Sequence, residues 1–93
     1  MAKKKKYQVE FQPKHIVSEM RRAYPKGSRV ELLWMDDKEA PPEGTRGTVT
    51  WVDDTASIMV KWDTGQTLSV IYDVDQCVRV YDEEKEEAWA TGQ

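Results

Sequence analysis

The sequence predicts a mainly β protein in which five short strands form a small barrel after one N-terminal helix. Between residues 25 and 81, five stretches of alternating apolar residues are separated by turn signals at regular intervals, which is typical of a sandwich or barrel. Residues 13–24 instead carry one apolar stripe at helical spacing. The 93 residues suffice for one domain, and four Trp and four Tyr supply much of its thin core.

The helix is expected over residues 13–24. Pro13 suits a first helical turn, where its missing N–H costs nothing, and Pro25 disfavours helical geometry at the residue before it. The apolar stripe of this helix consists of Ile16, Val17, Met20 and Tyr24. We expect the stripe to cover an open end of the barrel.

The connections between the strands define the kind of barrel. The strands are expected at residues 28–35, 45–52, 57–62, 67–71 and 77–81. A long acidic loop with two adjacent prolines spans 36–44, and residues 63–66 form a tight hairpin in which Gly65 supplies a positive φ. Residues 72–75 read as a single 3₁₀ turn before the last strand. A long first loop, tight hairpins and such a turn are the connection pattern of an SH3-like barrel.

Alternation along the second and third strands predicts where two tryptophans lie. Trp51 shares a face with Val49, and Trp62 shares a face with Val60. Both indoles are therefore expected to fill the core.

The charge is divided unevenly along the chain. Residues 1–29 hold nine basic and two acidic residues, a net charge of +7, whereas residues 30–93 hold five basic and fifteen acidic residues, a net charge of -10. Three segments follow from this division: a flexible basic arm over 1–12, the helix and barrel over 13–81, and an acidic tail over 82–93. We expect any partner to meet the two ends of the molecule differently.

The composition argues against catalysis and metal binding. Cys77 is the one cysteine and His15 the one histidine, so neither a disulfide nor a zinc site of usual composition is expected. The adjacent carboxylates at 36–37 and 53–54 point in different directions and suit turns better than acid–base chemistry. We expect no enzyme and no cofactor. Without an apolar run of about 20 residues we expect no membrane span. The single thiol favours a reducing, cytoplasmic setting, and we expect a monomer.

Several stretches resemble a small family of domains of unknown function that are SH3-like barrels. The resemblance covers roughly residues 16–80. Its most specific elements are Met35-Asp36-Asp37, the loop from Ala40 to Thr45, and Trp62-Asp63-Thr64-Gly65. The family is found largely in phages, mobile elements and Gram-positive bacteria, so the resemblance implies the barrel and a phage or mobile-element origin. It implies no activity.

Three functional hypotheses remain, and the preferred one is binding of a protein or peptide on the barrel surface near the 36–44 loop. SH3-like barrels use an aromatic surface beside this loop for extended ligands, and its acidic residues would select basic partners. The residues expected to form the surface are Trp34, Met35, Asp36, Asp37, Glu39, Pro41, Pro42 and Tyr72.

The alternatives depend on charge. A basic arm and helix would bind nucleic acid through phosphate contacts. Its residues would be Lys3, Lys4, Lys5, Lys6, Lys14, Arg21 and Arg22. A phage-encoded inhibitor would instead use the acidic surface to mimic nucleic acid. That surface would comprise Asp53, Asp54, Asp63, Asp73, Asp75 and residues 82–87.

Overall fold

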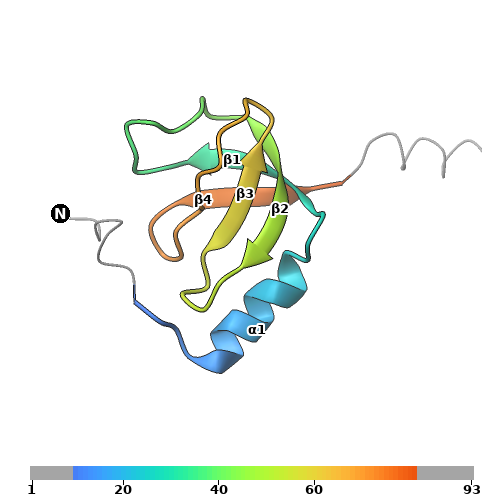
Figure 1. Cartoon of the computed structure of the whole chain (residues 1–93), viewed down its shortest axis with the longest axis vertical. Coiled ribbons are helices and arrows are strands. Elements are labelled where there is room, and N and C mark those ends of the chain that lie inside the picture. Colours follow the sequence, from blue (N-terminus) through green and yellow to red (C-terminus); the bar gives the residue numbers. More distant parts are fainter. Residues whose placement is uncertain (1–9, 82–93) are drawn as a thin grey trace, which may run out of the picture.

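The computed structural model describes residues 10–81 and consists of one helix and a four-stranded antiparallel sheet. The elements are α1 (Lys14–Ala23), β1 (Arg29–Trp34), β2 (Arg46–Val52), β3 (Ile58–Trp62) and β4 (Gln76–Val80). The strand order is β3-β2-β1-β4, so β1 and β4 lie side by side in the sheet although they are far apart in the sequence (Figure 1). The mainly β class and the single helix are confirmed, but the sheet does not close into a barrel.

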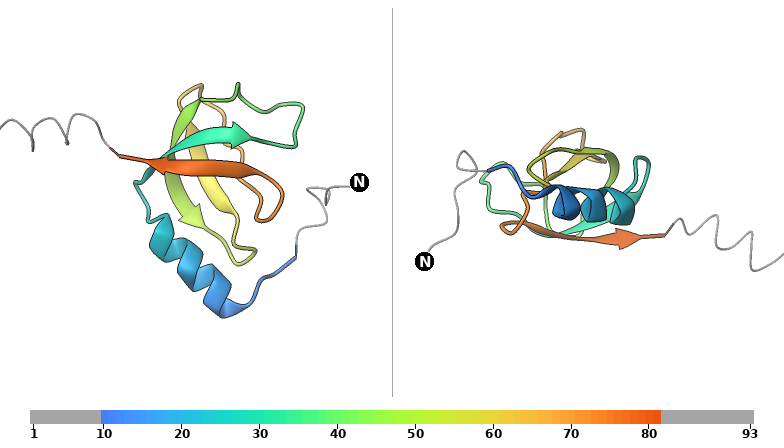
Figure 2. Two further views of the ribbon diagram at one scale, coloured as in Figure 1. Left: turned by 180° about the vertical axis from the view of Figure 1, so that it is seen from behind. Right: turned by 90° about the horizontal axis from the view of Figure 1, so that it is seen from below.

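Helix α1 forms where the sequence predicts it, and the predicted stripe is buried at Val17 and partly buried at Ile16, Met20 and Tyr24. Met20 and Tyr24 pack against the core of the sheet. The helix ends at Ala23, where the amide of Tyr24 donates to the carbonyl of Met20 at 2.8 Å. Figures 1 and 2 show α1 alongside the end of the sheet where β2 ends and β3 begins. The helix therefore covers the apolar side chains at that end.

The core lies on the inner face of the curved sheet. Its most deeply buried side chains include Val30, Leu32, Val49, Ile58 and Trp62, each at most 2% exposed. The indole Nε1 of Trp62 donates to the carbonyl of Leu68 at 2.8 Å, which satisfies its polar atom inside the core. The prediction that Trp62 fills the core is confirmed.

The prediction for Trp51 is wrong because β2 contains a bulge. The pairing between β2 and β3 runs in register to Val49↔Val60 and then shifts, so that Trp51 pairs with Met59. One extra residue reverses the alternation of inward and outward side chains beyond it. Trp51 is consequently 52% exposed, and Val52 occupies the core in its place.

The predicted strand at 67–71 is not a regular strand. A single bridge joins Val70 to Ile58 with hydrogen bonds of 2.8 and 2.9 Å, and the carbonyl of Leu68 is bound by the Trp62 indole instead of a neighbouring strand. The Trp62 side chain thus bonds a backbone carbonyl that the hydrogen-bond ladder of a regular strand would use. Residues 72–75 form a hydrogen-bonded turn in which the amides of Val74 and Asp75 both donate to the carbonyl of Ile71.

Candidate functional site

The eight residues predicted for protein binding lie in different environments. Met35 and Pro41 are buried, so they support the surface from below. Trp34, Asp36, Asp37 and Tyr72 are half-buried, and Glu39 and Pro42 are exposed. The structure therefore separates residues that hold the loop in place from residues that can contact a partner.

The 36–44 loop is held by hydrogen bonds within it and to neighbouring segments. A carboxylate oxygen of Asp37 accepts from the amide of Glu39 at 2.8 Å, and the amide of Gly44 donates to the carbonyl of Leu32 at 2.7 Å. The side-chain amide of Gln66 donates to the carbonyl of Glu39, which ties the loop to the 63–66 hairpin. These contacts give a loop of this length a defined shape.

Asp75 connects the start of this loop to the turn that carries Tyr72. The residue is 7% exposed, and its carboxylate accepts from the amide of Asp36 at 2.8 Å and from the amide of Ile71 at 2.8 Å. Two backbone donors compensate the burial of the charge. The sequence reading treated Asp75 as a surface acid, although its position at the end of the 72–75 turn was the signal for such a bond.

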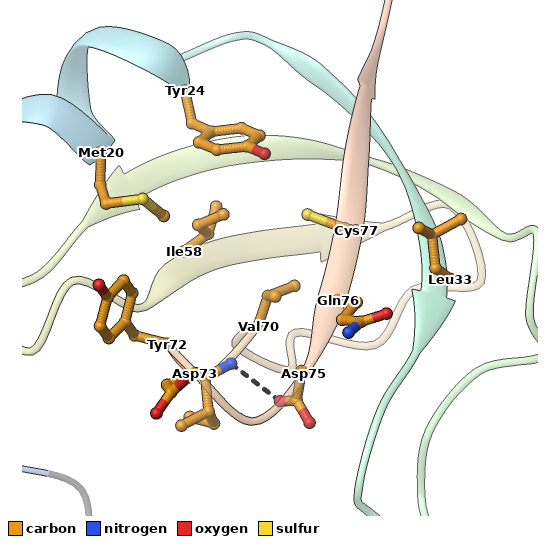
Figure 3. A pocket seen from close by; sticks show the side chains of 11 residues that line it. Met20, Tyr24, Leu33, Ile58, Val70, Tyr72, Asp73, Asp75, Gln76 and Cys77 are labelled. Atoms are coloured by element: carbon orange, nitrogen blue, oxygen red, sulfur yellow. Dashed lines mark hydrogen bonds between the residues drawn. The ribbon is translucent and has the colours of Figure 1, made fainter.

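A pocket of about 290 Å³ opens beside this connection. Figure 3 shows Tyr24 and Tyr72 on two sides of it, with Ile58 and Val70 between them. Its remaining lining residues are Met20, Leu33, Ile71, Asp73, Asp75, Gln76 and Cys77. The pocket joins the last turn of α1 to the 72–75 turn, two segments about 50 residues apart in the sequence. Sequence reasoning found Tyr72 but assigned Tyr24 only to the helix stripe.

Two side chains of the pocket, Cys77 and Tyr24, have raised pKa values. Burial, together with the nearby charge of Asp75, raises the pKa of the Cys77 thiol to about 11. Burial also raises the pKa of the Tyr24 hydroxyl. The neighbouring Cys77 raises this pKa further, whereas the positive charge of Arg79 lowers it. At neutral pH the thiol is therefore protonated and unreactive, so Cys77 serves as part of the wall.

Two of the residues predicted for nucleic-acid binding, Lys14 and Arg21, lie on a second surface, beside α1. Arg21 donates from Nε to the carbonyl of Val52 at 2.8 Å and forms an ion pair with Asp54 at 3.2 Å. Its guanidinium carbon lies 4.3 Å from the centroid of a ring of Trp51. Lys14 and Arg21 line a pocket of about 430 Å³ with the exposed Phe11. Arg22 is exposed, and Lys3 to Lys6 lie outside the described residues.

Many acidic residues of the third hypothesis have structural roles. One carboxylate oxygen of Asp53 accepts from the amides of Thr55 and Ser57 and from the Thr55 hydroxyl. Asp63 forms two hydrogen bonds to Arg29, at 2.9 and 2.6 Å. Internal partners partly neutralise this surface. Residues 82–87 lie outside the described part of the chain, and nucleic-acid mimicry stays a prediction from the sequence.

Residues 10–81 contain neither a metal-binding cluster nor a membrane-spanning helix. No three His, Cys, Asp or Glu side chains gather there in a way that could hold a metal ion. No helix in this part of the chain is long and apolar enough to span a bilayer.

Residues 13–80 match the family described as Domain of unknown function (DUF4314). Searches of the curated proteins and of the solved structures found no match. Because the family model covers most of the chain, the protein belongs to this domain family, whose description states no activity.

Proposed function

We propose that this member of the DUF4314 family is a non-enzymatic binding module that binds a segment of another protein. The ligand would lie on the surface that Asp75 holds together, from the start of the 36–44 loop to the 72–75 turn. The pocket between Tyr24 and Tyr72 is the observation that supports this most directly. Its walls come from separate parts of the fold and its floor is apolar, which suits an anchoring side chain.

The pocket is large enough for part of a peptide. Pockets that enclose drug-sized ligands or cofactors typically measure about 300–1,000 Å³. At about 290 Å³ this pocket lies at the lower end of that range and suits one or two side chains. Leu33, 41% exposed, adds apolar surface at its edge on β1.

We also propose that the chain is a variant of the SH3-like barrel. The sheet order β3-β2-β1-β4 supports this. The antiparallel bridge between Val70 and Ile58 supports it too, because it places the segment after the 63–66 hairpin beside β3. In this proposal, residues 67–71 take the place of a fifth strand. A phage or mobile-element origin stays an expectation, which the neighbouring genes would test.

The binding proposal is tested with a displayed library of random peptides selected on the immobilised full-length protein. We expect enriched peptides to shift the amide resonances of residues 71–77. Their affinity should fall about thirtyfold or more with Tyr72→Ala, since anchor residues contribute about 2 kcal/mol or more. Trp51→Ala is the matched control, because Trp51 is an exposed aromatic residue outside the pocket. A library without enrichment, or peptides that shift only other regions, would refute the proposal.

Nucleic-acid binding is the second candidate, and the surface around Arg21 favours it. The exposed Phe11 lines a pocket with Lys14 and Arg21, and Arg21 also lies over a ring of the exposed Trp51. Alternation of aromatic and basic side chains suits single-stranded nucleic acid, because bases stack on rings while cations bind the backbone. We expect single-stranded DNA to retain the protein at low salt, and both Trp51→Ala and deletion of residues 1–6 to reduce retention. Retention that neither change alters would remove this candidate.

A further inference from the structure

We propose that the ligand binds as an extended segment that pairs with the outer edge of β4 and places one apolar side chain in the pocket between Tyr24 and Tyr72. This inference rests on the proposed peptide-binding function and specifies how the peptide is held. Three observations support it: the hydrogen-bond register of β1, the open outer edge of β4, and the position of the pocket beside that edge.

The register of β1 determines which backbone groups of β4 point outward. The amide of Leu32 donates to the carbonyl of Thr45 at 2.8 Å, and the carbonyl of Leu32 accepts from the amide of Gly44 at 2.7 Å. Both groups of Leu32 are thus used on the β2 side, and its partner in β4, Cys77, forms a non-hydrogen-bonded pair with it. In such a pair the N–H and C=O groups of Cys77 point away from β1. Because the pattern repeats every two residues, those of Arg79 point outward as well.

This outer edge of β4 is open to another strand. Within residues 10–81, no strand pairs with it and no backbone hydrogen bond engages the outward groups of Cys77 and Arg79. At the opposite edge of the sheet, in contrast, Ile58 of β3 exchanges two hydrogen bonds with Val70. Strand β4 has no proline and a single charged side chain, although prolines and charges are what usually block an edge. The chemistry that matches alternating donors and acceptors is the backbone of an extended segment.

The pocket lies on the face that such a segment would meet. Figure 3 shows the side chain of Cys77 pointing from β4 into the pocket, which Ile58 and Val70 also line. Residues directly opposite each other on neighbouring strands have their side chains on the same face. The ligand residue paired with Cys77 would therefore direct its side chain into the pocket. Its two neighbours would face the other side of the sheet, where Val78 is 41% exposed, so one apolar residue between polar ones suits the site.

Hydrogen exchange of the free, full-length protein tests whether the edge is open. We expect the amides of Cys77 and Arg79 to exchange rapidly and those of Val78 and Val80 slowly, because only the latter pair with β1. Protection of the Cys77 and Arg79 amides without ligand would overturn the inference. Protection lost on dilution would then assign the edge to a second copy of the chain, and protection at every concentration to another segment of the same chain.

The pairing itself is tested with one synthetic probe, the acetylated pentapeptide amide Thr-Thr-Leu-Thr-Thr, in NMR titrations of the full chain. We expect a dissociation constant of about 1–10 mM, shifted amides over residues 76–80 and new protection of the Cys77 and Arg79 amides. N-methylation of the leucine should weaken binding at least about tenfold, because this N–H faces β4. N-methylation of the threonine after it is the matched control and should change the affinity by less than about threefold, because that N–H faces away.

Two further comparisons assign the pocket and the edge. Aspartate in place of the leucine should weaken binding at least about tenfold, because its carboxylate would be buried against apolar side chains. Arg79→Pro removes one outward N–H and leaves the β1 ladder intact, and should weaken binding about fivefold or more. Arg79→Ala removes the same side chain but keeps the N–H, and should stay within about twofold. The N-methyl comparison needs no change in the protein, so it decides the pairing even if Arg79→Pro unfolds.

The outcomes separate this inference from the peptide-binding function. If the two N-methyl peptides bind equally, strand pairing is overturned, and the pocket remains an anchor for a peptide in another conformation. If the aspartate peptide binds as well as the leucine peptide, the side chain assigned to the pocket is wrong. If the pentapeptide does not shift residues 76–80, the inference fails, and the peptide selection then decides by itself whether the surface binds peptides.

Discussion

Adding a single methyl group at Gly47 in β2 should strongly lower the stability of the fold. A Cβ atom there would lie 2.6 Å from Cγ1 of Val60, 2.8 Å from Cε3 of Trp62 and 2.9 Å from the carbonyl oxygen of Lys61. All three distances are shorter than atoms tolerate. Val60 and Trp62 belong to the packed core and the third contact is backbone, so little can move to make room.

The expected cost of Gly47→Ala follows from these contacts. Forcing extra atoms into a packed core costs about 1–3 kcal/mol, and three close contacts place Gly47→Ala in the upper half of that range. A domain of this size loses about 4–8 °C of melting temperature per kcal/mol. We therefore expect unfolding about 10–20 °C lower than in the wild type. Urea and thermal unfolding followed by circular dichroism would measure the change.

A double-mutant cycle tests the stated cause. Val60→Ala removes the side-chain atom in the shortest contact, so Gly47→Ala should cost less in that background than in the wild type. Thr67→Ala is a surface control, which we expect to stay within about 0.5 kcal/mol of the wild type. A Gly47→Ala protein as stable as the wild type, or a cycle without coupling, would refute the packing argument.

Three further predictions concern ionisable groups. Cys77, with its pKa raised to about 11, should react with iodoacetamide at a rate that keeps rising beyond pH 9; a rate that levels off there would contradict this. Since the unfolded thiol ionises first, the wild type should lose stability relative to Cys77→Ser as the pH rises from about 9 to 11. The carboxyl of Asp63 should titrate below its ordinary pKa of 3.8, and its pKa should return toward that value with Arg29→Gln. The stability that this pair contributes is present above the ordinary pKa and disappears as the pH falls through the lowered value. An unshifted titration of Asp63 in carbon-detected NMR would refute the pairing. Asp75→Asn should cost about 2 kcal/mol, because one of two charge-assisted bonds to backbone amides is lost, whereas Asp73→Asn should cost little; equal urea midpoints would show that the Asp75 bonds contribute nothing to stability.

The sequence predicted the elements of the fold from local patterns. The stripe ending at Tyr24 predicted α1, because residues three and four apart share one helix face. Four predicted strands appear close to their expected bounds, and Gly65 adopts the positive φ that the 63–66 hairpin requires. These features depend on residues that are neighbours in the chain, so the sequence alone could reveal them.

The positions of individual side chains depended on contacts between distant residues. A bulge in β2 turned Trp51 outward while Trp62 stayed inside, although both share the same alternating pattern. The alternation of a strand cannot reveal a bulge, since the partner strand determines the register. The Trp62 indole likewise took a carbonyl of the 67–71 segment, so that segment lacks the ladder of a regular strand.

The candidate site divides in the same way between sequence and structure. The sequence by itself determined a mainly β chain with one helix, an acidic loop over 36–44 and Tyr72 as an aromatic beside it. Only the tertiary structure shows that Tyr24 and Tyr72 line the same pocket. It also shows that Asp75, expected on the surface, is buried and links the 36–44 loop to the 72–75 turn by hydrogen bonds to two backbone amides. The physical reason is that secondary structure follows local periodicity, whereas a pocket forms where segments about 50 residues apart pack together.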